Sequence, residues 1–161
     1  MNGKARNEEQ MVMFCLSGQN YGVSIDSVYE VIRMEKITKI PETPDFVEGV
    51  INLRGKSIAV VDLSKRLSFV KAEITDSSRI IIMDIGSTKA GFIVDEVLEV
   101  IHVPQESIQP APRLANSIDS EFLKGVALLD KEMVIVLDIS NLLQQFETES
   151  LIAAQEKAEV E

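Results

Sequence analysis

The stretch YGVSIDSVYEVI, residues 21–32, is written a second time as AGFIVDEVLEVI at residues 90–101, with six of the twelve positions identical. A second block, FVEGVINLRGKSIAVVDLSKRL at residues 46–67, recurs as FLKGVALLDKEMVIVLDISNLL at residues 122–143, with eight of twenty-two positions identical. The two blocks occur in the same order in both halves of the chain. The sequence therefore predicts one structural unit of roughly seventy residues that is used twice.

Each copy of the unit reads as short strands separated by turn residues at intervals of about ten, a pattern typical of small barrels or sandwiches. Aromatic residues are only 5% of the chain, so Ile, Val and Leu must build the core, which favours strands. A unit this small is marginal alone, so we expect an apolar seam between the copies. The expected strands are MVMFCL, YGVSI, EVIRM, VEGVINL and SIAVVDL in the first copy, and RIIIMDI, AGFIV, EVIHV, LKGVALL and EMVIVLDI in the second.

Charge and composition exclude several classes of function. The chain carries 26 acidic and 16 basic side chains, a net charge of −10, which opposes binding to nucleic acid or to an anionic membrane. Its apolar runs have the length of strands, so we expect no direct membrane insertion. One histidine, His102, and one cysteine, Cys15, allow no histidine dyad, no multi-histidine metal site and no internal disulfide. We predict no catalytic residue, no cofactor, no metal and a reduced, cytosolic compartment.

The segment GVINLRGKS, residues 49–57, comes within one residue of a phosphate-binding P-loop. A P-loop has four residues between its first Gly and the Gly-Lys-Ser, and here five intervene. A helix must also follow, whereas IAVVDL is β-branched and typical of a strand. We therefore interpret residues 54–57 as a hairpin turn. Arg54 and Gly55 are absent from the second copy, so they serve either the turn alone or a role specific to the first copy.

Two carboxylate pairs recur in the repeat, Asp26 with Glu30 and Asp95 with Glu99. On a helical turn this spacing would put each pair on one face, where two carboxylates can act as acid and base or hold a metal. The alternative is that the aspartates cap short helical turns and the glutamates are solvated. No nucleophile repeats beside either pair, which favours the alternative.

The chain resembles the family of the chemotaxis coupling protein CheW over about residues 11–147. The motifs are VYEVIRM, ITKIPETPDFVEGVINLRGKSIAVVDL, the EFLKGVALL block and PAP at residues 110–112. The resemblance implies an all-β fold of two SH3-like, five-stranded β-barrel subdomains that pack on a shared hydrophobic core, plus a short C-terminal helix. We expect the first barrel at residues 11–75 and the second at residues 76–147, with exchange of strands between them allowed.

For function, the resemblance implies a non-enzymatic adaptor. Members bridge the cytoplasmic hairpin tips of methyl-accepting chemoreceptors to the regulatory domain of the histidine kinase CheA, and are recruited from the cytoplasm to membrane receptor arrays. Val28 and Ile32 are the expected apolar anchors of the receptor site. Carried over residue by residue, the receptor-binding positions are Val28, Glu30, Ile32, Gly49, Asn52 and Arg54, and the kinase or ring contacts are Gln109, Arg113 and Leu114.

The two ends of the chain are expected to lie outside the barrels. Residues 1–10 are charged and nearly free of apolar side chains, which predicts a disordered leader. Residues 148–161 are expected to form a helical or disordered tail, exposed beyond about residue 152. Ser140 and the matching Ser64 are the expected starts of two helices. Two alternative functions stay open, a coupling or regulatory domain of another kinase system and a small-molecule or nucleotide hydrolase.

Overall fold

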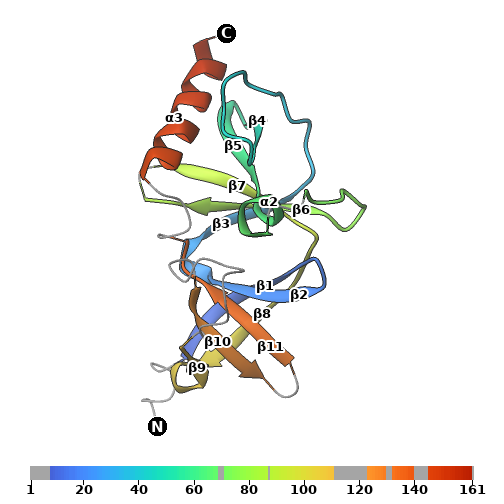
Figure 1. The fold of residues 1–161 in the computed structure, drawn as a ribbon, viewed down its shortest axis with the longest axis vertical. Coiled ribbons are helices and arrows are strands. Elements are labelled where there is room, and N and C mark those ends of the chain that lie inside the picture. Colours follow the sequence, from blue (N-terminus) through green and yellow to red (C-terminus); the bar gives the residue numbers. More distant parts are fainter. Residues whose placement is uncertain are drawn as a thin grey trace.

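In a computed structural model the chain forms two β-sheets and a C-terminal helix, with the sheets one above the other in Figure 1. The structure describes residues 8–68, 71–86, 88–110, 123–129, 132–139 and 145–160. The first sheet contains β1 (Glu8–Leu16), β2 (Gln19–Ser24), β8 (Glu96–Pro104), β9 (Ile108–Gln109), β10 (Leu123–Leu129) and β11 (Glu132–Leu137). The second contains β3 (Val28–Arg33), β4 (Val47–Leu53), β5 (Lys56–Asp62), β6 (Arg79–Asp84) and β7 (Lys89–Val94).

All ten strands that the repeat predicts are present, as β1 to β5 in the first copy and β6, β7, β8, β10 and β11 in the second. The order of strands is β8-β1-β2-β11-β10-β9 in one sheet and β3-β6-β7-β5-β4 in the other. Under the alignment of the repeat, these two orders are the same. Each sheet therefore combines two strands of one copy with three of the other, and a cut at residue 75 does not coincide with the boundary between the sheets.

Short connections explain why each sheet contains strands from both copies of the repeat. Only Ile25–Ser27, a single 3₁₀ turn (η1), separates β2 from β3, and only Asp95 separates β7 from β8. Since neither link adds a hairpin that would return the chain to the same sheet, each copy continues into the other sheet. The incoming strands are held by parallel pairing of β11 with β2 and of β5 with β7.

Each sheet closes on itself. After β3, Thr38 exchanges two backbone hydrogen bonds of 2.8 Å with Val50 of β4, at the opposite end of the strand order. In the other sheet β8 continues through a 3₁₀ turn, η2 (Gln105–Ser107), into β9, which pairs with β10. The fold is mainly β, as predicted, and two closed sheets are consistent with SH3-like barrels. If β9 is counted as the continuation of β8, each barrel has five strands.

The buried apolar residues of the described part of the chain form three clusters. One fills the interior of the first sheet and includes Met11 and Val136, and another fills the second sheet with Ile51, Ile80 and Ile82. The third and largest cluster lies between the sheets and takes residues from both. Its Phe14, Phe92, Leu63, Ile81 and Met83 are almost fully buried. The apolar seam expected between the copies is this shared core.

The helices differ in detail from the sequence prediction. The first, α2 (Leu63–Ser68), is capped by buried Asp62, whose Oδ1 accepts the Lys65 N–H at 3.1 Å, so Ser64 is not its cap. The second, α3 (Gln145–Val160), packs beside β4 and β5. Leu151, Ala154 and Gln155 of α3 are buried, so the expectation of an exposed tail beyond about residue 152 was wrong.

Further predictions concerned the N-terminal leader, Ser140 and the two repeated aspartates. β1 begins at Glu8, so the predicted leader at residues 1–10 is too long by three residues. Residues 1–7 and Ser140 lie outside the described residues. The aspartates of the two carboxylate pairs are not caps, because Ser24 Oγ accepts the Asp26 N–H at 3.3 Å and Asp95 accepts the Ser17 N–H at 2.8 Å.

Candidate functional site

A two-residue turn, Arg54–Gly55, joins β4 to β5. Both residues have positive φ, 51° at Arg54 and 88° at Gly55, which is the conformation of a type I′ hairpin turn. Asn52 Oδ1 accepts the Gly55 N–H at 2.8 Å and fixes the turn from inside the hairpin. The hairpin predicted from the sequence is confirmed, and the segment is not a P-loop because a strand rather than a helix follows it.

Arg54 forms a two-point ion pair with Glu30 of β3, across 24 residues of sequence. Arg54 Nη1 lies 3.1 Å from Glu30 Oε2, and Nη2 contacts Oε1. β3 and β4 stand at opposite ends of the strand order, so closure of the barrel brings the two side chains together. The Glu30 side chain is 25% exposed and that of Arg54 is 64% exposed. The pair therefore lies at the surface, where a binding partner can reach it.

The ion pair shifts the titration of both groups. The hydrogen bond from Arg54 lowers the pKa of Glu30, against an opposing effect of partial burial, and the positive charge of Arg54 acts in the same direction as the bond. The pKa of Arg54 is raised, first by the hydrogen bond and charge of Glu30 and to a smaller extent by the neighbouring Tyr29. The carboxylate stays ionised and is a poor general base, which suits recognition better than proton transfer.

The two expected apolar anchors face inward. Val28 packs against the shared core, and Ile32 packs against the core of the second sheet. The exposed apolar side chains of β3 are instead Tyr29 and Val31, 57% and 40% exposed. The sequence prediction overlooked them because it carried over positions from the family rather than following the alternation of the strand, which turns successive side chains to opposite faces.

Gly49 has an architectural role. It has φ +146°, and a Cβ there would lie 2.2 Å from the carbonyl oxygen of Thr38, in the bridge that closes the second sheet. Its repeat partner Gly125 lies in the same way against Gln109, where a Cβ would be 2.5 Å from the carbonyl oxygen. Both copies keep this glycine because the closing segment must approach the backbone.

The predicted kinase or ring contacts are only partly described. Gln109 is exposed at the end of β9 and pairs with Val126 of β10. Arg113 and Leu114 lie outside the residues that the structure describes. Gln109 is in the first sheet and the Glu30–Arg54 pair is in the second, so the two sets of predicted residues belong to different barrels.

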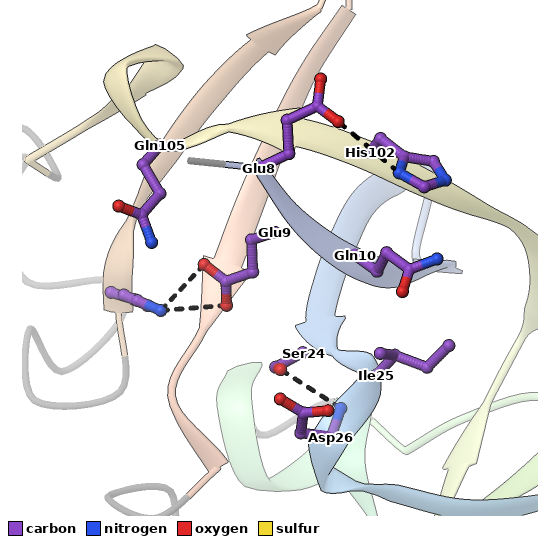
Figure 2. A pocket seen from close by; sticks show the side chains of 9 residues that line it. Glu8, Glu9, Gln10, Ser24, Ile25, Asp26, His102 and Gln105 are labelled. Carbon is purple, nitrogen blue, oxygen red and sulfur yellow. Dashed lines mark hydrogen bonds and ion pairs between the residues drawn. The ribbon is translucent and has the colours of Figure 1, made fainter. Parts of the chain in front are cut away.

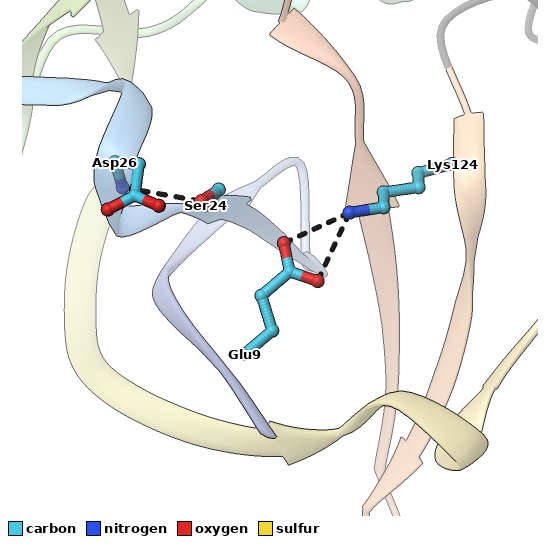
Figure 3. A network of polar contacts seen from close by, with 4 residues as sticks. All are labelled: Glu9, Ser24, Asp26 and Lys124. Carbon is cyan, nitrogen blue, oxygen red and sulfur yellow. Dashed lines mark hydrogen bonds and ion pairs between the residues drawn. The ribbon is translucent and has the colours of Figure 1, made fainter. Parts of the chain in front are cut away.

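A separate open hollow of about 570 Å³ lies at the end of the first sheet and contains none of the predicted site residues. Figure 2 shows Glu8 beside His102, with Glu8 Oε1 3.9 Å from His102 Nδ1. Figure 3 shows Lys124 Nζ reaching both carboxylate oxygens of Glu9, at 3.0 and 3.1 Å. Ionisable side chains of its walls thus contact one another. We regard the Glu30–Arg54 surface as the functional site.

The described part of the chain offers neither a metal centre nor a membrane span. No three or more His, Cys, Asp or Glu side chains of that part are grouped so that they could hold a metal ion. None of its helices combines the length and the apolar character needed to cross a bilayer. The Glu30–Arg54 surface combines an ion pair with the exposed side chain of Tyr29, a combination typical of binding surfaces.

Comparison with known proteins gives one consistent result. The CheW-like domain family model matches residues 10–147. Chemotaxis protein CheW of Klebsiella aerogenes is 32% identical over 86% of this chain and 84% of its own length, and that of Bacillus subtilis is 30% identical over 96% and 99%. The crystal structure of the scaffolding protein TtCheW from Thermoanaerobacter tengcongensis superposes with a TM-score of 0.78 at 45% identity, covering 86% of this chain and 90% of that one.

The family match covers nearly all of both barrels, including the β3 strand and the β4–β5 hairpin that carry the ion pair. The structural match extends the agreement from sequence to the arrangement of the strands. Both agree with the motifs recognised in the sequence and with a surface suited to binding. The chain belongs to the CheW-like family of chemotaxis coupling adaptors, which are scaffolds rather than enzymes.

Proposed function

We propose that the chain couples the cytoplasmic hairpin tips of methyl-accepting chemoreceptors to the regulatory domain of the histidine kinase CheA. The observation that carries this proposal is the surface ion pair between Glu30 and Arg54. Both residues stand at family positions implied in receptor binding, and the barrel brings them together although they are far apart in sequence. A charge pair that is already aligned loses little side-chain freedom when a partner docks beside it.

The receptor surface consists of β3 and the β4–β5 hairpin of the second sheet. Glu30 and Arg54 supply its charged part, and Tyr29, which is close to Arg54, supplies exposed apolar area. Val28 and Ile32 contribute by holding β3 against the cores, and Asn52 by holding the turn. An antiparallel helical hairpin offers the complementary shape, with apolar and charged side chains on one helix face.

The kinase domain uses the first sheet in this proposal, near Gln109 and the residues that follow it. Because the two candidate surfaces lie on different barrels, receptor and kinase can bind at the same time. Coupling then requires no chemistry, only simultaneous contacts with both partners. The adaptor acts in the cytoplasm and reaches the membrane arrays through its receptor contacts.

The proposal is tested by titrating the ¹⁵N-labelled chain with a soluble receptor-tip hairpin, with a kinase regulatory domain, and with both together. We expect the hairpin to shift backbone NMR signals of residues 28–33 and 52–56. The kinase domain should shift signals around Gln109, and the three proteins should form one complex. Competition between the two partners for the chain would contradict the bridging function.

A further inference from the structure

Tyr29 is the extra residue of a β-bulge. Val28 pairs with Met83 of β6 and Glu30 pairs with the preceding residue, Ile82, so Tyr29 has no partner on β6. A bulge bends its strand locally and is often found beside functional sites. Tyr29 is 57% exposed, on the solvent side of the alternating strand, and precedes Glu30 of the ion pair in sequence.

The exposed ring is held by a cation. Lys89 Nζ of β7 lies 4.8 Å from the centre of the Tyr29 ring, within the range of a cation–π contact. Tyr29 is also close enough to Arg54 to contribute to the raised pKa of the guanidinium group. An aromatic side chain that contacts neighbouring cations loses less freedom when a partner docks on it.

The second copy of the repeat has the same bulge without this chemistry. Leu98 of β8 is the extra residue there, because Met13 pairs with Glu99 and Phe14 pairs with Val97. The alignment puts Asn20 at the position of Lys89, and its side chain donates a hydrogen bond to Glu132 at 3.4 Å. The shared architecture therefore explains the bulge, whereas a tyrosine and a lysine occupy these two aligned positions only in the second sheet.

We propose that Tyr29 and Lys89 are the specificity-determining contacts of the receptor surface. The Tyr29 ring receives an apolar side chain of the partner helix, and the Lys89 ammonium receives a carboxylate one helical turn away. Side chains one turn apart on a helix face have Cβ atoms about 5–6 Å apart. They can therefore reach the ring and the ammonium together, since Lys89 Nζ lies 4.8 Å from the centre of the Tyr29 ring. The inference rests on the proposed receptor function and adds the partner chemistry that the site selects.

Charge supports a carboxylate as the partner group. The chain has a net charge of −10 and as a whole repels acidic surfaces. A carboxylate of a partner can therefore bind only beside a local cation. The positive charge of Arg54 is already paired with Glu30. Lys89 contacts only the neutral face of Tyr29 among the interactions observed for it, so its ammonium can still donate to a carboxylate.

Isothermal titration calorimetry of the full chain with a soluble receptor-tip hairpin tests the inference. Tyr29→Leu replaces the ring by the residue found at the equivalent bulge and is expected to weaken Kd by about tenfold. Tyr29→Phe keeps the ring and should stay within about twofold of wild type. Lys89→Met should weaken binding by about three- to tenfold at low salt and should reduce the dependence of Kd on salt. Ile74→Ala, at an exposed apolar residue between α2 and β6 and outside the strands that carry the receptor surface, is the control and should bind as wild type does.

The outcomes separate the inference from the function on which it rests. Wild-type affinity in Tyr29→Leu would overturn the inference while the receptor function stands. An unchanged salt dependence in Lys89→Met would overturn the role of the lysine. If the wild-type chain does not bind the hairpin, the receptor function and the inference both fail. Melting curves of each variant, expected within about 2 °C of wild type because both side chains lie at the surface, separate lost contacts from lost folding.

Discussion

The side chain of Gln155 accepts a hydrogen bond of 2.7 Å from the backbone N–H of Ala59, 96 residues earlier, and so joins α3 to β5. Its Nε2 donates to Thr88 Oγ1 at 3.2 Å. Gln155 is buried together with Leu151 and Ala154 on the inner face of the helix. A polar side chain that satisfies a buried backbone group gives the position of α3 a specificity that apolar contacts alone would not.

Replacing Gln155 by Leu is therefore expected to destabilise the protein. The Ala59 N–H loses its side-chain acceptor in a buried environment, which costs about 1–3 kcal/mol of unfolding free energy. Urea unfolding measures the change as a lower midpoint at constant slope. Glu156→Gln, at the exposed neighbouring position, is the matched control. Equal midpoints for Gln155→Leu and wild type would show that this hydrogen bond does not stabilise the docked helix.

Gly49→Ala and Gly55→Ala are expected to differ in cost although both glycines have positive φ. A Cβ at Gly49 would meet the Thr38 carbonyl oxygen at 2.2 Å, whereas nothing lies within 4 Å of a Cβ at Gly55. Gly55→Ala should cost about 1 kcal/mol from backbone strain alone. Gly49→Ala should cost more than about 3 kcal/mol, because the bridge that closes the barrel must open. Similar unfolding free energies for the two variants would contradict the role assigned to Gly49.

Arg54→Asn is expected to separate binding from stability. Asn-Gly is the preferred sequence for a type I′ turn, whereas arginine with φ 51° is in a conformation that most side chains avoid. We expect a melting temperature equal to that of wild type or about 1–3 °C higher, and receptor binding weaker by about tenfold or more. Lys71→Ala, at an exposed cation outside β3 and the β4–β5 hairpin, should change binding by at most about twofold. A melting temperature that falls together with binding would make Arg54 a structural residue.

The titration of Glu30 is expected to depend on Arg54. The pKa of Glu30 is lowered in the folded chain, so the stabilisation from the pair is fully present above the unfolded pKa and is lost as the pH falls through the folded value. NMR titration of the side-chain carboxyl carbon should give a pKa below the ordinary range in wild type. In Arg54→Asn the value should rise, and receptor binding of the wild type should weaken only in acid. An identical pKa in both proteins would mean that the pair does not form in solution.

Much of the strand content and of the turn chemistry followed from local patterns. Alternation and turn residues predict each strand of the repeat, and the β-branched run after GKS predicts the hairpin at Arg54. The residues of the candidate site were predicted less completely from the sequence. Glu30 and Arg54 were named through the family resemblance, but Tyr29 and Lys89 were not. The alternation of β3 that exposes Tyr29 was not followed, and the contact of Lys89 with the Tyr29 ring joins two distant segments of the chain.

The C-terminal helix is a second case in which the sequence alone did not predict which residues are buried. Its Ala, Glu, Gln and Lys residues favour a helix but do not specify which side is buried. The hydrogen bonds of buried Gln155 go to Ala59 of β5 and to Thr88 in the connection between β6 and β7, two segments far apart in the sequence. No pattern within residues 145–160 contains that information.

By itself, the sequence determined that the protein is a duplicated β structure with a hairpin at Arg54, because strand alternation and turn conformation are local properties of the chain. Only the tertiary structure decided which strands lie together. The exchange of β1 and β2 for β6 and β7 and the meeting of Glu30 with Arg54 depend on pairing between distant segments. Burial of apolar surface drives that pairing but is not directional, so the partners become known only when the barrels close.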